Sequence, residues 1–135
     1  MDITVRNAVQ AVDVAFLYLL QQDVSNIPET GARWQERRLY STDLEDYAVT
    51  SKLLTFESWM VEVYQGVAPL SRTVYRLTAY NSKTRCYWQG SVRADGSISG
   101  SSSPKQLSEK EGQEIAAGIS RKLEIPAPRP GTYGH

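Results

Sequence analysis

Apolar residues near the N-terminus recur at helical spacing. Steps of three and four residues separate the members of one stripe, which are Val5, Val9, Val12, Phe16 and Leu19. This spacing places them on one face of a helix with about 3.6 residues per turn. We expect Thr4 to cap this helix at its N-terminus and the segment 25–28, which closes with Pro28, to end it. The apolar face is predicted to pack against the core.

Farther along the chain, apolar residues alternate with polar ones. Trp59, Val61 and Val63 form the first alternating set. The inward-facing members of two later runs are Tyr75, Leu77 and Ala79, followed by Cys86, Trp88 and Val92. A period of two places successive side chains on opposite faces of a strand. Three such runs joined by short loops predict an antiparallel meander with one buried face.

The segment before these runs allows two interpretations. Thr42 and Glu45 have the spacing of a capping box, which would begin a helix. The same segment is also rich in residues that favour strands, and it leads into the sheet. We predict a strand from about Leu53 onward and leave residues 43–52 unassigned.

Two turns set the predicted register of the meander. A tight turn at Ser82 and Lys83 would place Ala79 opposite Cys86, Leu77 opposite Trp88, Tyr75 opposite Gly90 and Thr73 opposite Val92. At the next turn, a three-residue loop with Gly96 in the left-handed conformation pairs Val92 with Ile98. A two-residue loop would instead turn Ile98 to solvent, so the apolar pattern favours the three-residue loop.

The C-terminal part is predicted to form a second helix. After a loop rich in serine and glycine, Ser108 and Glu111 have the spacing of another capping box. The apolar face of the helix that follows consists of Ile115, Ile119 and Leu123. Residues 126–135 are rich in proline and glycine and are expected to form a flexible tail.

These elements predict a single α+β domain over residues 1–125. It has an N-terminal helix, an antiparallel β-meander of about four strands and a C-terminal helix, with both helices packed on one face of the sheet. In architecture alone, this arrangement resembles the cystatin-like and NTF2-like scaffolds, whose curved sheet can hold a ligand.

Charge and composition restrict the function classes. The chain of 135 residues has 15 basic and 15 acidic side chains, so its formal net charge is zero. This balance gives no overall attraction to nucleic acid or to an anionic membrane. The charge is nevertheless uneven, because residues 1–30 carry a net charge of −3 and residues 66–97 a net charge of +4.

The expected location is the cytoplasm, without membrane association. A single cysteine, Cys86, cannot form an internal disulfide, so no oxidising compartment is required. The apolar run 12–20 contains Asp13 and is too short to span a bilayer. It also lacks the basic start and the cleavage site of a signal peptide.

Residues suited to catalysis or metal binding are scarce. The only histidine is His135, in the predicted tail, and Cys86 is expected in a strand as a small buried hydrophobe. This disfavours a Ser–His or Cys–His pair, and two such residues are too few for a zinc site. The carboxylates of Asp43, Glu45 and Asp46 could bind a cation, but acids are also favoured at a helix N-terminus. The sequence therefore identifies no catalytic residue, no metal site and no cofactor.

The outer face of the meander is the candidate binding surface. The register gathers arginine and tyrosine side chains there: Tyr64, Arg72, Arg76, Tyr80, Arg85, Tyr87 and Arg93. Arg72 is expected to face Arg93, and such like charges repel unless an anionic group lies between them. Arginine and tyrosine are enriched among interface anchors, although an ordinary solvated sheet face also tolerates them.

We predict a small, non-catalytic interaction module that uses this face to bind a protein partner or a second copy of itself. The alternative is a protein, or an enzyme, of cystatin-like or NTF2-like shape that binds a small ligand in a pocket. Nucleic-acid binding is disfavoured by the zero net charge and the acidic N-terminal part.

Overall fold

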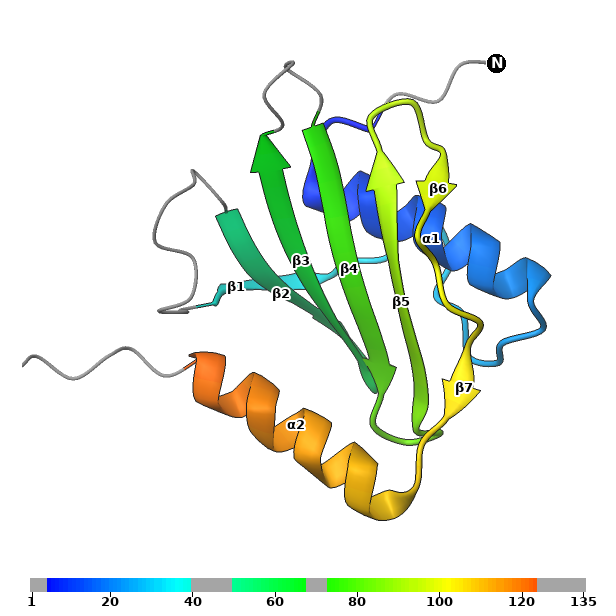
Figure 1. Ribbon diagram of the computed structural model, residues 1–135, viewed down its shortest axis with the longest axis vertical. Coiled ribbons are helices and arrows are strands. Elements are labelled where there is room, and N and C mark those ends of the chain that lie inside the picture. The colour runs from blue at the N-terminus through cyan, green and yellow to red at the C-terminus, as the bar shows by residue number, and fades with distance from the viewer. Residues whose placement is uncertain (1–4, 40–49, 68–72, 124–135) are drawn as a thin grey trace, which may run out of the picture.

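The computed structural model describes residues 5–39, 50–67 and 73–123 (Figure 1). Its elements in chain order are α1 (Ala8–Gln21), β1 (Gln35–Arg38), β2 (Thr50–Phe56), β3 (Trp59–Val67), β4 (Thr73–Asn81), β5 (Cys86–Arg93), β6 (Ile98–Ser99), β7 (Lys105–Gln106) and α2 (Glu109–Leu123). The strands form one antiparallel sheet in the order β1-β2-β3-β4-β5-β6, and β7 pairs with β5. The predicted α+β class, with a helix before and a helix after an antiparallel sheet, is confirmed.

The described residues contain seven strands, more than the four or so expected. The additional strands β1, β6 and β7 have only two to four residues each, and β1 is exposed along its whole length. A period of two cannot be recognised in such short segments. β2 begins at Thr50, slightly earlier than predicted, whereas residues 43–49 and the predicted tail 126–135 lie outside the described ranges.

The N-cap of α1 is Asn7, so the expectation for Thr4, which lies outside the described residues, is wrong. The Asn7 side-chain oxygen accepts a hydrogen bond from the backbone N–H of Gln10 at 2.9 Å. Val5 donates its backbone N–H to the carbonyl of Ala94 at 2.8 Å. This bond ties Val5 to the loop after β5, and the helix therefore begins later than the apolar stripe suggests.

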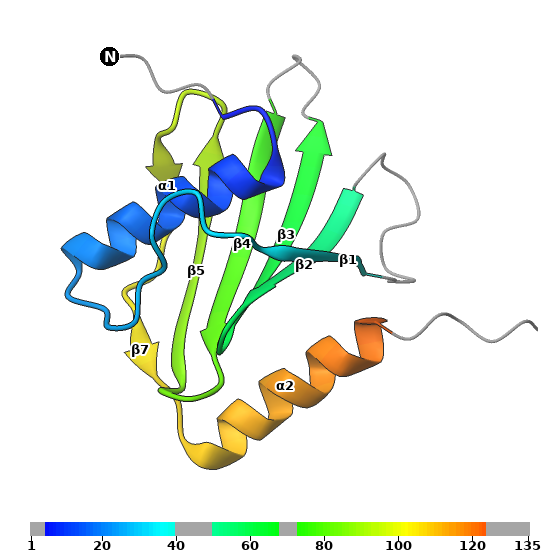
Figure 2. The ribbon, with the colours of Figure 1, turned by 180° about the vertical axis from the view of Figure 1, so that it is seen from behind.

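α1 lies against the inner face of the sheet and passes in front of the strands in Figure 2. The predicted alternation is confirmed, because the following inward-facing residues are all buried: Trp59, Val61, Val63, Tyr75, Leu77, Ala79, Trp88 and Val92. Cys86, predicted to be buried with them, packs against the same core but is only partly buried. From α1, the side chains of Val12, Phe16 and Leu19 enter the same core. The Phe16 ring meets the Trp59 ring edge to face, with 4.8 Å between centroids.

Trp88 and Gly90 are neighbours on the inner face of β5. The Trp88 indole reaches so close to Gly90 that a Cβ atom at this position would overlap the ring. The Trp88 ring also contacts the Tyr18 ring of α1, with 5.8 Å between centroids. Glycine at position 90 therefore makes room for an indole at the interface between helix and sheet.

The predicted register between β4 and β5 is wrong by two residues. The observed pairs are Tyr75 with Val92, Leu77 with Gly90 and Ala79 with Trp88. The turn is longer than the expected pair Ser82 and Lys83, because the Asn81 side-chain oxygen accepts the backbone N–H groups of Lys83 and Thr84, each at 2.9 Å. Arg85 closes the turn in the left-handed conformation, with φ of 63°. An even shift leaves every side chain on its predicted face.

The predicted turn between β5 and β6 is confirmed. Val92 pairs with Ile98, and Gly96 is left-handed with φ of 85°. The Asp95 carboxylate accepts hydrogen bonds from the backbone N–H and the hydroxyl of Ser97, at 2.9 and 2.6 Å. These local bonds stabilise the turn that the apolar pattern selected.

α2 packs on the outer face of the sheet, opposite α1, so the expectation that both helices share one face is wrong. Its predicted capping box is present: Glu111 donates its backbone N–H to the Ser108 hydroxyl at 3.1 Å, and Ser108 donates its N–H to the Glu111 carboxylate at 3.2 Å. The outer face contains its own apolar patch. That patch joins the helix in a second cluster made of Leu39, Leu53, Met60, Ile115, Ile119 and Leu123.

The sequence alone did not reveal this patch because its members come from separate segments. Leu53 pairs with Glu62, which places it on the outer face, whereas its neighbour Leu54 belongs to the inner core. β2 is therefore buried on both faces and does not alternate.

α2 lies close to the sheet at Gly112, where a Cβ atom would overlap the Tyr80 hydroxyl. We expect Gly112→Ala to lower the free energy of unfolding, although alanine favours a helix by about 1 kcal/mol over glycine. Gly118→Ala is the matched control, because the nearest atom to its Cβ would be an Arg121 nitrogen at 3.9 Å. Chemical denaturation of both variants tests the contact, and Tyr80→Phe in the Gly112→Ala background should recover part of the loss. A Gly112→Ala variant as stable as Gly118→Ala would contradict this packing.

Candidate functional site

The structure places the predicted arginine and tyrosine residues in three different environments. Arg76 and Arg93 are exposed, Tyr64, Arg85 and Tyr87 are half-buried, and Tyr80 is buried with 3% exposure. Arg72 lies outside the described residues. The expected Arg72–Arg93 pair is wrong, because the shifted register places Arg93 opposite Val74.

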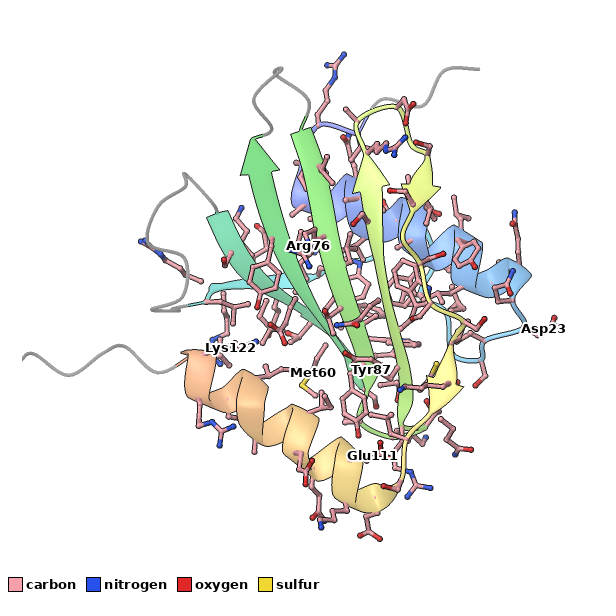
Figure 3. All side chains as sticks on the ribbon, in the orientation of Figure 1. Asp23, Met60, Arg76, Tyr87, Glu111 and Lys122 are labelled. Atoms are coloured by element: carbon pink, nitrogen blue, oxygen red, sulfur yellow. The ribbon has the colours of Figure 1, made fainter. Side chains whose placement is uncertain are left out.

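Cross-strand pairing brings Arg76 to the middle of the outer face. Tyr64 on β3 lies opposite Arg76 on β4, and Ser91 on β5 lies on its other side. The next row contains Thr78 and Gln89, whose side chains are joined by a hydrogen bond of 3.4 Å. Figure 3 shows Arg76 above the region that α2 covers.

Tyr80 and Tyr87 form the third row, closer to α2. They pair across β4 and β5, and the hydroxyl of Tyr80 lies under Gly112. The Lys105 ammonium lies 5.6 Å from the centre of the Tyr87 ring, within the range of a cation–π contact. Burial raises the pKa of Tyr87, so this tyrosine stays neutral at physiological pH. Tyr80 and Tyr87 therefore mainly contact α2 and β7.

Arg85 has a structural role that the sequence did not indicate. Its left-handed backbone closes the β4–β5 turn, and its carbonyl accepts the Leu107 N–H at 2.8 Å. This bond connects the turn to the segment that leads into α2.

A partly buried ion pair joins α2 to the outer face. Lys122 donates to the Glu62 carboxylate at 2.8 Å and to the Tyr64 hydroxyl at 3.2 Å, and the Tyr64 hydroxyl donates to Glu62. The Glu62 side chain is 7% exposed, so its charge requires these partners. Burial alone would lower the pKa of Lys122, but the bonds to Glu62 and Tyr64 outweigh it and raise the pKa. Burial, followed by the bond to Glu62, raises the pKa of Tyr64.

This network determines which charged side chains of the outer face remain accessible to a partner. Arg76 shares the outer face with Glu62, but the counter-ion of Glu62 is Lys122. Arg76 thus remains exposed, and within the described part of the chain it has no ion-pair partner. Lys122 was not identified on the sequence, although it follows Ile119 by three residues and so lies on the apolar side of α2.

The described residues include few groups suited to redox or metal chemistry. Burial raises the pKa of the Cys86 thiol, which makes it a poorer nucleophile. Among the residues in the described ranges, no group of three His, Cys, Asp or Glu side chains could hold a metal ion. Asp43, Glu45, Asp46 and His135 lie outside those ranges. The same part of the chain contains no helix that is long and apolar enough to cross a membrane.

Comparison with known proteins assigns no family. No family model matches the chain, and no curated protein or solved structure matches it significantly. The function of the chain is therefore inferred from the arrangement of its own residues.

The Glu62–Lys122 pair makes a testable contribution to stability. Lys122→Met keeps most of the apolar stem but leaves the buried Glu62 carboxylate without its cation. We expect the free energy of unfolding to fall by about 1 kcal/mol, less than for a fully buried pair because Lys122 is 39% exposed. Urea denaturation at neutral pH measures this loss.

The double variant Glu62→Gln with Lys122→Met is the control for this pair. It removes both charges together, so no unpaired carboxylate remains, and it should recover most of the stability. A double variant that is less stable than Lys122→Met alone would contradict the coupling between the two residues.

Proposed function

We propose that this protein is a small, non-catalytic interaction module that binds an acidic protein surface at the part of its outer sheet face that α2 leaves open. The supporting observation is Arg76, which is exposed in the middle of the sheet without an ion-pair partner among the described residues. Arg93 adds a second exposed cation at the far end of β5. Half-buried Tyr64, on the strand next to Arg76, supplies an aromatic surface beside it.

The chemistry of these side chains fits carboxylates. An arginine guanidinium presents a planar fork of N–H donors that can hold a carboxylate with two parallel hydrogen bonds. Glu62 does not compete for Arg76, because Lys122 and Tyr64 already occupy it. The sheet fixes the backbone of Arg76, so the entropy lost on binding is confined to its side chain.

A protein partner is favoured over nucleic acid. The chain has no net positive charge, so it has no overall electrostatic attraction to a polyanion. A second copy of the chain is one source of an acidic surface, since residues 1–30 carry a net charge of −3. The single cysteine, Cys86, supports placing such a module in a reducing compartment such as the cytoplasm.

The proposal is tested by selecting ligands for the face. A random peptide library displayed on phage is selected on the wild-type chain, and binding of the recovered peptides is measured by calorimetry. We expect peptides rich in Asp and Glu. Arg76→Glu with Arg93→Glu should weaken their binding by about tenfold or more, since each lost contact is a charge-assisted hydrogen bond.

The matched control is Arg6→Glu with Arg121→Glu, which changes the net charge equally at two exposed positions outside this face. Equal loss in both double variants, or recovery of peptides without acidic residues, would contradict the proposal. Light scattering separates the two kinds of protein partner: a dimer that dissociates only in the Arg76→Glu, Arg93→Glu variant identifies a second copy. Equally tight and salt-sensitive binding of an unrelated oligonucleotide would assign the face to nucleic acid instead.

A further inference from the structure

A cavity of about 170 Å³ lies between α1 and the segment that connects α1 to β1. Its apolar lining consists of Phe16, Leu17, Leu20, Ile27, Pro28 and Trp34, and its polar lining of Asp13, Glu29 and Thr30. Leu17 and Leu20 are 46% and 55% exposed and form the outer rim. The cavity borders the inner-face core and is separate from the outer face on which the proposed function depends.

The wall opposite α1 is a folded loop with several anchors. The Trp59 indole N–H donates to the carbonyl of Asn26 at 2.7 Å, which ties the loop to the core. Asn26 and Gly31 adopt left-handed backbone conformations, with φ of 62° and 88°. Ala32 donates its N–H to the Glu29 carbonyl at 3.0 Å. The cavity is therefore shaped before any ligand arrives, which lowers the entropic cost of binding.

Aromatic rings form one end of the cavity. Trp34 stands next to Phe16, with 5.5 Å between ring centroids, and next to Phe56 at 5.7 Å. Aromatic surface of this kind attracts both apolar groups and cations.

The charged side chains of the described residues that line the cavity are both acidic. Asp13 comes from α1 and Glu29 from the loop, and within the described ranges no basic side chain lines the cavity. The backbone N–H of Gly31 donates to the Asp13 carboxylate, but burial has the larger effect and raises the pKa of Asp13. A carboxylate held in partly apolar surroundings is stabilised by a nearby positive charge.

We propose that this cavity binds a small organic ammonium ion, with its apolar body against Phe16, Ile27 and Trp34 and its charged group at Asp13 and Glu29. The size fits a ligand built on one ring, since a cavity of about 150 Å³ accommodates benzene. An organic ammonium ion matches both the apolar lining and the two carboxylates. A neutral hydrocarbon or an anion would match only the apolar lining. Such a ligand agrees with the small-ligand alternative that the sequence leaves open. The sequence did not indicate this cavity as its location.

Benzylamine is the probe, because it carries one ring and one ammonium group. We expect calorimetry to show binding to the wild-type chain, and amide chemical shifts to change at Asp13 and along residues 27–34. Benzyl alcohol, with the same ring and no charge, should bind about tenfold more weakly, and phenylacetate should not bind. Methylammonium, which has the charge without the ring, should also fail to bind.

Asp13→Asn tests the charge, because asparagine keeps an oxygen that can accept the Gly31 N–H. This variant should bind benzylamine about tenfold more weakly than the wild type. Asp23→Asn is the matched control, since Asp23 is exposed, lies beyond the end of α1 and does not line the cavity (Figure 3). Equal binding of benzylamine and benzyl alcohol, unchanged affinity in Asp13→Asn, or shifts confined to other regions would each overturn the proposal.

The pH dependence of stability gives a second measurement that needs no ligand. A raised pKa in the folded state means that the Asp13 carboxylate opposes folding above that pKa, and that this effect disappears below the ordinary value of 3.8. Asp13→Asn should therefore unfold at a higher temperature than the wild type at pH 7, and at a similar temperature well below pH 3.8. A lower unfolding temperature of Asp13→Asn at pH 7 would assign Asp13 to holding the loop, and would overturn its role as a ligand group.

Discussion

The absence of a side chain at Gly90 is the constraint on which the inner core depends. Because Trp88 can reach over Gly90, its indole lies between the sheet and α1 and contacts Tyr18 without pushing the helix away. α1 thus covers the inner face closely enough to bury Val12 and Leu19 completely. Because α1 occupies the inner face, α2 packs on the smaller apolar patch of the outer face.

α2 is held to the outer face by a mixed contact. Around Leu53 and Met60 the contact is apolar, whereas at Lys122 it is an ion pair to the buried Glu62. The apolar part supplies most of the favourable free energy, since an ion pair regains only part of the hydration that its charges lose. The pair joins the last turn of α2 to β3. It also removes Glu62 from the surface and leaves Arg76 as the central charge of the open region.

The alternation of apolar and polar residues predicts some features of this fold and leaves others undetermined. Alternation assigned the two faces of β3, β4 and β5 correctly, and it also selected the Gly96 turn, because a slip of one residue there would expose Ile98. It did not fix the β4–β5 register, since the even shift caused by the Asn81 turn exchanges partners without changing faces. The cavity beside α1 was also hidden from the sequence. Its shape depends on left-handed residues such as Asn26, whose conformation no short-range pattern specifies.

The two edges of the described sheet limit how these molecules can meet one another. At one edge, β1 consists of Gln35, Glu36, Arg37 and Arg38, all exposed. Extending the sheet from this strand would bring the charged side chains of a neighbouring β1 alongside it and strip their water. At the other edge, β6 and β7 occupy opposite ends of β5, so that β5 offers no long free row of backbone donors and acceptors. Strand-to-strand polymerisation is therefore disfavoured, and a crowded solution of this protein should resist fibril formation.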